Sequence, residues 1–299
     1  SRQTGLSDSD VRLIRYNAST RTLVIAYANG NIDLMTSDGI YNLPFLKNTT
    51  NIQDKTLNAI DLSGDRAYLS ANFGILVIDL KKREVAETYR LDRRTTATAL
   101  LGGSIYAATD SGLLSAPTTA NLMDVGNWKR VSLNSLDFDD QKIVGLSAFR
   151  DRLCFVASGG GLFYRDTDGS IKTLRKQTNL RGLTVVGNRL VAYTAEAMYV
   201  FASLEGTGET VAPGTINGVT ALTENGRFWV ASGRNGLVGL RRRAEGQYEK
   251  AISGLKIEGP KRNEDDFMIV DRGRLWVVGG SYTNTARGNR RGTLMSCVD

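Results

Sequence analysis

The residues best suited to binding chemistry lie in a basic loop near the end of the sequence. Residues 281–292 read SYTNTARGNRRG and carry Tyr282, Arg287, Arg290 and Arg291. The nearby stretch at residues 259–266, GPKRNEDD, adds Lys261 and Arg262. Guanidinium groups form paired hydrogen bonds with carboxylates and phosphates, so this pattern predicts a contact site for an anionic group or a protein partner. The alternative is a solvated loop whose arginines pair with Glu264, Asp265 and Asp266.

Catalysis and metal binding find much less support in the residue types. The chain has no histidine and two cysteines, which excludes Ser-His-Asp triads, Cys-His pairs, His-based zinc sites and four-thiolate sites. The acidic stretch DFDD at residues 137–140 lacks the alternating spacing and distal glutamate of an EF-hand calcium loop. No pair of carboxylates can be singled out as acid and base. We therefore expect no enzyme activity, no catalytic residue, no metal site and no cofactor.

Three consecutive glycines, Gly159, Gly160 and Gly161, could form either a phosphate-binding loop or a tight turn. A phosphate loop must be followed by the start of a helix, whose N–H groups converge on the anion. Here the following residues, LFYRD, continue as an apolar strand. The pattern therefore predicts a turn that uses positive φ angles, and no nucleotide site.

Charge and hydropathy narrow the range of partners. Lys and Arg number 38 against 31 Asp and Glu, a net charge of +7 that is mostly scattered along the chain. This indicates either a soluble basic surface or an anionic partner such as an acidic glycan. The chain has no basic helix, RNP-like strand or zinc-finger spacing, which argues against nucleic acid. No apolar run approaches the roughly 18 residues of a membrane helix, so no integral membrane segment is expected.

One unit recurs along the whole sequence: an apolar strand, a small-residue turn and a second apolar strand. Examples are DRAYLSANFGILVIDL, RLCFVASGGGLFYRD and GRFWVASGRNGLVGL. Each has a strand-like run before it, and most have another after it. Four antiparallel strands thus recur about every 36 to 56 residues, a period typical of propeller blades. The arginines at positions 241–243 end a third strand and are interpreted as a charged sheet edge.

The repeats predict an all-β fold, a propeller of about seven four-stranded antiparallel blades whose last blade is incomplete. Residues 1–299 would form a single propeller domain, which we expect to be a fragment of a longer multidomain protein. Long connections fall mainly between blades and between second and third strands, which emerge on one face of a propeller. That face is predicted to carry binding.

Three blocks of the sequence resemble a known family of propellers. They are TGLSDSDVRLIRYNASTRTLVIAYANGNIDLM, LNAIDLSGDRAYLSANFGILVIDLKKREVAETY and SIYAATDSGLLSA with NLMDVGNWKRV. They are similar to two-component-regulator-type propellers of Bacteroidetes, and most of all to the N-terminal propeller of PorZ-like proteins of the Por (type IX) secretion system. The GILVIDLKKREVAETY block is distinctive, whereas the LWIGT signature of the sensor propellers is absent.

The resemblance implies a non-enzymatic binding or scaffolding propeller of a secreted or cell-surface protein, located in the periplasm or at the surface of a Gram-negative envelope. Its partner would be an envelope protein or an anionic glycan. The alternative is the periplasmic ligand-sensing propeller of a hybrid two-component histidine kinase that recognises glycans.

Overall fold

The structure is a computed structural model. It describes residues 6–8, 10–133, 142–216, 218–220, 228–231, 237–243, 247–255, 265–271, 274–279 and 294–298. Side chains are described up to residue 252, except at positions 218, 220, 229, 231 and 237. Nearly all regular structure in these ranges is β, which confirms the all-β prediction.

The strands form consecutive antiparallel sheets in simple chain order, six of four strands and one of three strands. The first three sheets comprise β1 (Val11–Asn17), β2 (Thr22–Tyr27), β3 (Ile32–Thr36), β4 (Gly39–Leu43), β5 (Leu57–Ser63), β6 (Arg66–Ala71), β7 (Gly74–Asp79), β8 (Glu84–Arg90), β9 (Thr95–Leu101), β10 (Ser104–Thr109), β11 (Gly112–Pro117) and β12 (Lys129–Arg130). The next two comprise β13 (Ile143–Phe149), β14 (Arg152–Ala157), β15 (Leu162–Arg165), β16 (Ile171–Arg175), β17 (Gly182–Val186), β18 (Arg189–Tyr193), β19 (Met198–Phe201) and β20 (Glu209–Val211).

The last two sheets comprise β21 (Gly218–Thr220), β22 (Phe228–Ala231), β23 (Leu237–Arg242) and β24 (Tyr248–Leu255), then β25 (Asp265–Asp271), β26 (Arg274–Gly279) and β27 (Leu294–Val298). Two short helical turns occur in connections, α1 (Phe45–Asn48) and η2 (Val125–Asn127). The predicted four-stranded antiparallel unit is therefore observed throughout blades β1–β20.

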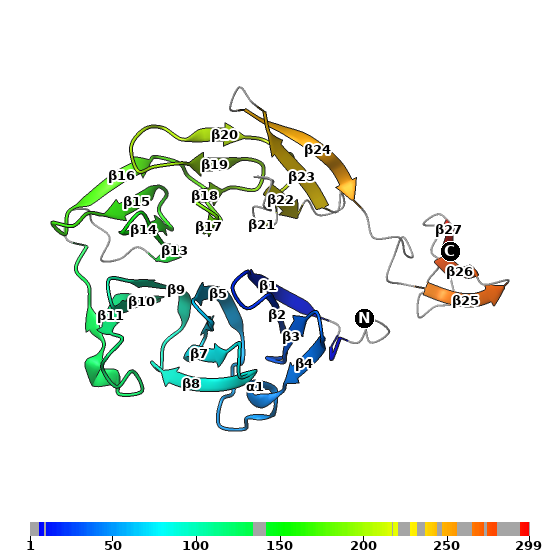
Figure 1. Cartoon of the computed structure of the whole chain (residues 1–299), viewed down its shortest axis with the longest axis horizontal. Helices are drawn as coiled ribbons and strands as arrows, with labels where there is room; N and C mark the ends of the chain where they lie inside the picture. The colour runs from blue at the N-terminus through cyan, green and yellow to red at the C-terminus, as the bar shows by residue number, and fades with distance from the viewer. Residues whose placement is uncertain are drawn as a thin grey trace, which may run out of the picture.

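Five of these sheets, β1–β20, form the blades of the propeller. Their inner strands β1, β5, β9, β13 and β17 pack side by side around the axis (Figure 1). The first and fifth blades are in contact next to this axis. There Arg15 Nη2 of β1 donates a hydrogen bond to Thr184 Oγ1 of β17 at 2.5 Å. A contact between residues 169 positions apart thus makes blade 5 a neighbour of blade 1.

The prediction of about seven blades is wrong, because the propeller has five. The sixth sheet shares a hydrophobic core with blade 5, but its inner strand β21 contacts β17 far less than consecutive inner strands from β1 to β17 contact one another. The three-stranded sheet β25–β27 lies apart from the ring (Figure 1). The repeat pattern counts sheets correctly, but whether a sheet joins the ring depends on how inner strands pack, which a local pattern does not encode.

The hydrophobic core lies between neighbouring blades rather than at the axis. One cluster joins blades 1 and 2, including the buried residues Val24, Leu34, Leu69 and Leu76. Similar clusters join blades 2 and 3, 3 and 4, and 4 and 5. Alternation along each strand sends side chains to both faces of a blade, so the inner blades bury apolar residues on both sides.

Glycines occupy the tight connections where the backbone needs positive φ. Gly160 and Gly161 have φ of 102° and 113° in the turn between β14 and β15, so the predicted turn is confirmed. Gly74, with φ of 138°, begins β7 where the chain passes very close to β8. A Cβ at this position would lie 2.0 Å from the carbonyl oxygen of Tyr89.

We expect Gly74→Ala to lower the free energy of unfolding by about 3 kcal/mol or more, because it combines a strained φ with a backbone clash. Gly64→Ala is the matched control, since Gly64 has φ of 58° but open space around its Cβ position. That change should cost about 1 kcal/mol. Denaturant unfolding of both variants measures the difference, and equal losses would contradict the close approach of β7 to β8.

Candidate functional site

The predicted binding residues lie outside the described residues. This holds for Tyr282, Arg287, Arg290, Arg291, Lys261 and Arg262, and also for the acidic stretch at residues 137–140. Among the arginines at positions 241–243, Arg241 and Arg243 both form ion pairs with Glu249 across β23 and β24. These two lie on and just after β23, which is paired on both sides by β22 and β24, so they do not form the sheet edge that was predicted.

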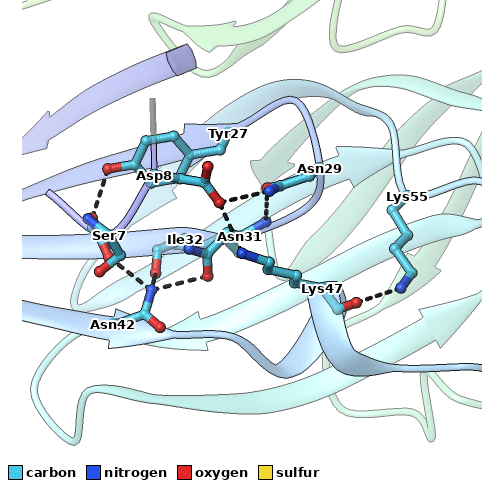
Figure 2. A network of polar contacts seen from close by, with 10 residues as sticks. Ser7, Asp8, Tyr27, Asn29, Asn31, Ile32, Asn42, Lys47 and Lys55 are labelled. Carbon is cyan, nitrogen blue, oxygen red and sulfur yellow. Dashed lines mark hydrogen bonds and ion pairs between the residues drawn. The ribbon is translucent and has the colours of Figure 1, made fainter. Parts of the chain in front are cut away.

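A polar network lies on the predicted binding face of blade 1, where the β2–β3 turn meets the N-terminal residues (Figure 2). Its centre is Asp33, a fully buried carboxylate on β3. Tyr27 donates its hydroxyl to Asp33 Oδ2 at 2.6 Å, the Ser7 backbone N–H donates to the same oxygen at 2.8 Å, and Asn42 Nδ2 donates to Oδ1 at 2.8 Å. Burial raises the pKa of Asp33, but these hydrogen bonds outweigh it and hold the pKa below the usual range.

The exposed part of the network brings two lysines to this face. Asp8 accepts hydrogen bonds from Asn29 Nδ2 at 2.6 Å and from Lys47 Nζ at 2.9 Å. Lys55 Nζ donates to the carbonyl oxygen of Lys47 at 2.5 Å (Figure 2). The buried carboxylate thus anchors the segment that carries Asp8, and Asp8 in turn positions Lys47. This arrangement can offer ammonium groups and amides to a partner.

A second polar cluster lies at the propeller axis, where blades 1, 2 and 5 meet. Besides its bond to Thr184, Arg15 donates from Nε to the carbonyl oxygen of Ile60 at 3.3 Å. Asp61, the next residue on β5, has no ion pair within 4.0 Å among the described residues. Burial raises the pKa of Asp61 to about 6, although the positive charge of Arg15 opposes this shift. Tyr193 on β18 lies close enough for its pKa to respond to Arg15.

Sequence reasoning did not single out this axial cluster. Arg15, Asp61 and Thr184 come from three blades, and no spacing rule connects positions so far apart. One signal was available, because the charged residue Asp61 lies within the strand-like run LNAIDL. A charged residue within an inner strand must find a polar environment, and here that environment is the axis.

Within the described ranges, no group of three or more His, Cys, Asp or Glu side chains could hold a metal ion. Cys154 is a buried free thiol, and burial raises its pKa to about 12, so it lies in an environment that disfavours the reactive thiolate. None of the helices described is long and apolar enough to cross a membrane.

Comparison with known proteins shows which propellers the chain is similar to. Residues 1–129 match the family model of the PorZ N-terminal β-propeller domain of the type IX secretion system. The structure of PorZ from Porphyromonas gingivalis, described as an essential bacterial surface component of that system, is 28% identical with a TM-score of 0.80. The predicted resemblance to the PorZ N-terminal propeller is confirmed. The match covers 100% of this chain and 39% of PorZ, so the chain spans about two fifths of the length of PorZ.

Sensor propellers share the fold. The extracellular domain of the hybrid two-component system BT4673 from B. thetaiotaomicron is 14% identical with a TM-score of 0.59, covering 98% of this chain and 38% of its own. The corresponding domain of BT3049 from B. thetaiotaomicron is 13% identical with a TM-score of 0.59, covering 91% and 39%. No curated protein matches the sequence. The sensor domains therefore support the architecture, whereas the similarity to PorZ extends to the sequence.

We expect Asp61 to make the propeller less stable as pH rises through its titration. Its pKa in the folded state, about 6, lies above the ordinary aspartate value of 3.8, so the folded state holds this proton more tightly. The stabilising contribution is fully present below about pH 4 and is lost as pH rises through 6. Relative to Asp61→Asn, the wild-type protein should lose roughly 1–3 kcal/mol of unfolding free energy between pH 4 and 7.

Urea unfolding of wild type and Asp61→Asn at several pH values measures this difference. The comparison with the variant removes the contributions of the other groups that titrate between pH 4 and 7, chiefly the surface carboxylates. A difference that stays constant across the pH range would contradict the raised pKa.

Proposed function

We propose that this chain is a non-enzymatic binding or scaffolding propeller of a PorZ-like surface component of a type IX secretion system. The observation that carries the proposal is the similarity to PorZ over the whole chain, at 28% identity and a TM-score of 0.80. The family match over residues 1–129 supports it independently. The similarity to PorZ, a bacterial surface component, supports an extracytoplasmic location at the envelope surface.

The chemistry of the described residues is consistent with a binding role. The two polar clusters are engaged in architecture, because Asp33 anchors the N-terminal segment and Arg15 joins blades across the axis. The absence of histidine from the sequence removes the commonest general base. Binding by a propeller instead uses loops carried on a rigid scaffold.

The proposed contact surface is the basic loop, with Tyr282, Arg287, Arg290 and Arg291 as its main groups and Lys261 and Arg262 beside it. Its partner is an envelope protein or an anionic glycan, since guanidinium groups suit carboxylates and phosphates.

The second candidate function is a ligand-sensing propeller of a two-component system. It is favoured by the shared fold of the BT4673 and BT3049 extracellular domains.

The basic loop can be tested with a triple variant, Arg287→Gln, Arg290→Gln and Arg291→Gln, in the full-length protein of the source organism. We expect loss of type IX cargo from the cell surface and reduced recovery of envelope partners in cross-linked pull-downs. The reason is that three charge-assisted contacts are removed while the scaffold is unchanged. Mass spectrometry of the pull-down and surface proteomics provide the measurements.

The matched control is Arg21→Gln, Lys81→Gln and Lys82→Gln, which removes the same charge from exposed turns of β1–β2 and β7–β8. It should leave secretion and partner recovery at wild-type levels. Normal secretion by the loop variant would reject the proposed contact surface, and normal secretion after deletion of the whole gene would reject the secretion role itself. An altered transcriptional response to a glycan, with normal secretion, would favour the sensor.

A further inference from the structure

A pocket of about 190 Å³ lies where the outer part of blade 5 meets the sixth sheet. Its walls come from the start of β18, the β19–β20 connection and the end of β23 with the start of β24. The pocket is thus lined by the β17–β18, β19–β20 and β23–β24 connections. Within their sheets these connections join the first strand to the second or the third strand to the fourth. The pocket therefore opens on the opposite face from the one that the sequence predicts for binding.

Three residues with side-chain hydrogen-bond donors, Arg189, Arg242 and Tyr248, line this pocket. Arg189 and Arg242 both line it, and both lie close enough to Tyr248 for their charges to oppose the rise in the pKa of its hydroxyl that burial causes. Arg189 forms no ion pair within the part of the chain that the structure describes. Two guanidinium groups and a phenol that line one pocket are a set of donors suited to an oxyanion.

The central side chain of the pocket is held firmly in place. The backbone N–H of Tyr248 donates to Glu209 Oε1 at 3.1 Å, which ties β24 to β20. The ring of Tyr248 packs on Phe228, with 5.0 Å between ring centroids. Phe228 is itself fully buried, so the Tyr248 ring is supported from the core of the sheet. Preorganisation of this kind lowers the entropic cost of binding.

The floor of the pocket is apolar and close-packed. It is formed by Val200 and Phe201, which are buried on β19. Gly208 brings the β19–β20 connection down onto the Phe201 ring. With φ of 69°, its Cβ position would lie 2.5 Å from Phe201 Cε1, so only glycine fits. An occupant therefore meets an apolar surface below and donors at the side.

Size and charge select among oxyanions. A volume of about 190 Å³ suits one side chain rather than a drug-sized ligand, which needs about 300 Å³ or more. Glu205 and Glu209 also line the pocket and offset the charges of Arg189 and Arg242. Both anions can use the guanidinium fork, but these carboxylates repel a phosphate dianion about twice as strongly as a monoanionic carboxylate. An apolar stem on the occupant would cover Phe201.

We propose that this pocket binds an acidic side chain, Glu or Asp, of a protein partner, with Arg189, Arg242 and the Tyr248 hydroxyl as the carboxylate contacts. The inference goes beyond the proposed function, because it concerns a second surface made of other residues. Failure of this pocket to bind would not affect the proposal for the basic loop. Failure of the basic loop would likewise not affect the proposal for this pocket.

The test uses a blocked amino acid, N-acetyl-glutamate amide, as the probe, and its neutral isostere N-acetyl-glutamine amide as the comparison. Both are titrated into the isotope-labelled chain and followed by amide chemical shifts. We expect saturable shifts around Arg189 and Tyr248 with the glutamate probe, and binding about tenfold weaker with the glutamine probe. Inorganic phosphate should bind more weakly than the glutamate probe.

Variants assign the effect to residues. Arg189→Gln should weaken the glutamate probe about tenfold, and Tyr248→Phe, which keeps the ring on Phe228, by about threefold. Arg181→Gln is the matched control, because Arg181 is exposed in the β16–β17 connection outside the pocket. Thermal melting within a few degrees of wild type shows that each variant is folded. Equal binding of the two probes, tighter binding of phosphate, or unchanged binding by Arg189→Gln would each overturn the proposal.

Discussion

The structure depends on how each inner strand satisfies the carbonyl groups along its edge at the axis. An inner strand pairs with one neighbour only, so its other edge needs hydrogen-bond donors from elsewhere. A polar side chain of the preceding blade supplies a donor to a carbonyl of the next blade in three of the five contacts around the ring. Arg15 Nε donates to Ile60 O, Asn58 Nδ2 to Thr95 O at 2.8 Å, and Thr96 Oγ1 to Ile143 O at 2.8 Å.

The remaining two contacts of the ring are made in other ways. Between blades 4 and 5 the backbones approach directly, because a Cβ at Gly145 would lie 2.9 Å from Leu183 Cβ. Between blades 5 and 1 the long side chain of Arg15 spans the gap to Thr184. Burying that guanidinium without a directly bound carboxylate is costly, and the nearby charge of Asp61 offsets part of the cost. The axis is therefore both the joint of the ring and its main electrostatic cluster.

A ring built in this way frees its two faces for different roles. On one face the Asp33 network fixes the N-terminal residues and places Lys47 and Lys55. On the other face the junction of blade 5 with the sixth sheet forms the pocket around Tyr248. The similarity to PorZ concerns the scaffold that both faces share, whereas the chemistry offered to partners depends on individual loops.

Local patterns in the sequence were sufficient to predict the all-β class, the four-stranded antiparallel unit, the glycine turn at residues 159–161 and the resemblance to PorZ. These features follow from strand alternation and turn chemistry, which act over a few residues. Tertiary structure alone decided that five blades close around the axis. It also brought Arg15 to Asp61 and Thr184, and Arg189 to Tyr248. The reason is physical: these contacts join residues from different sheets, and hydrophobic periodicity carries no information on which sheets become neighbours.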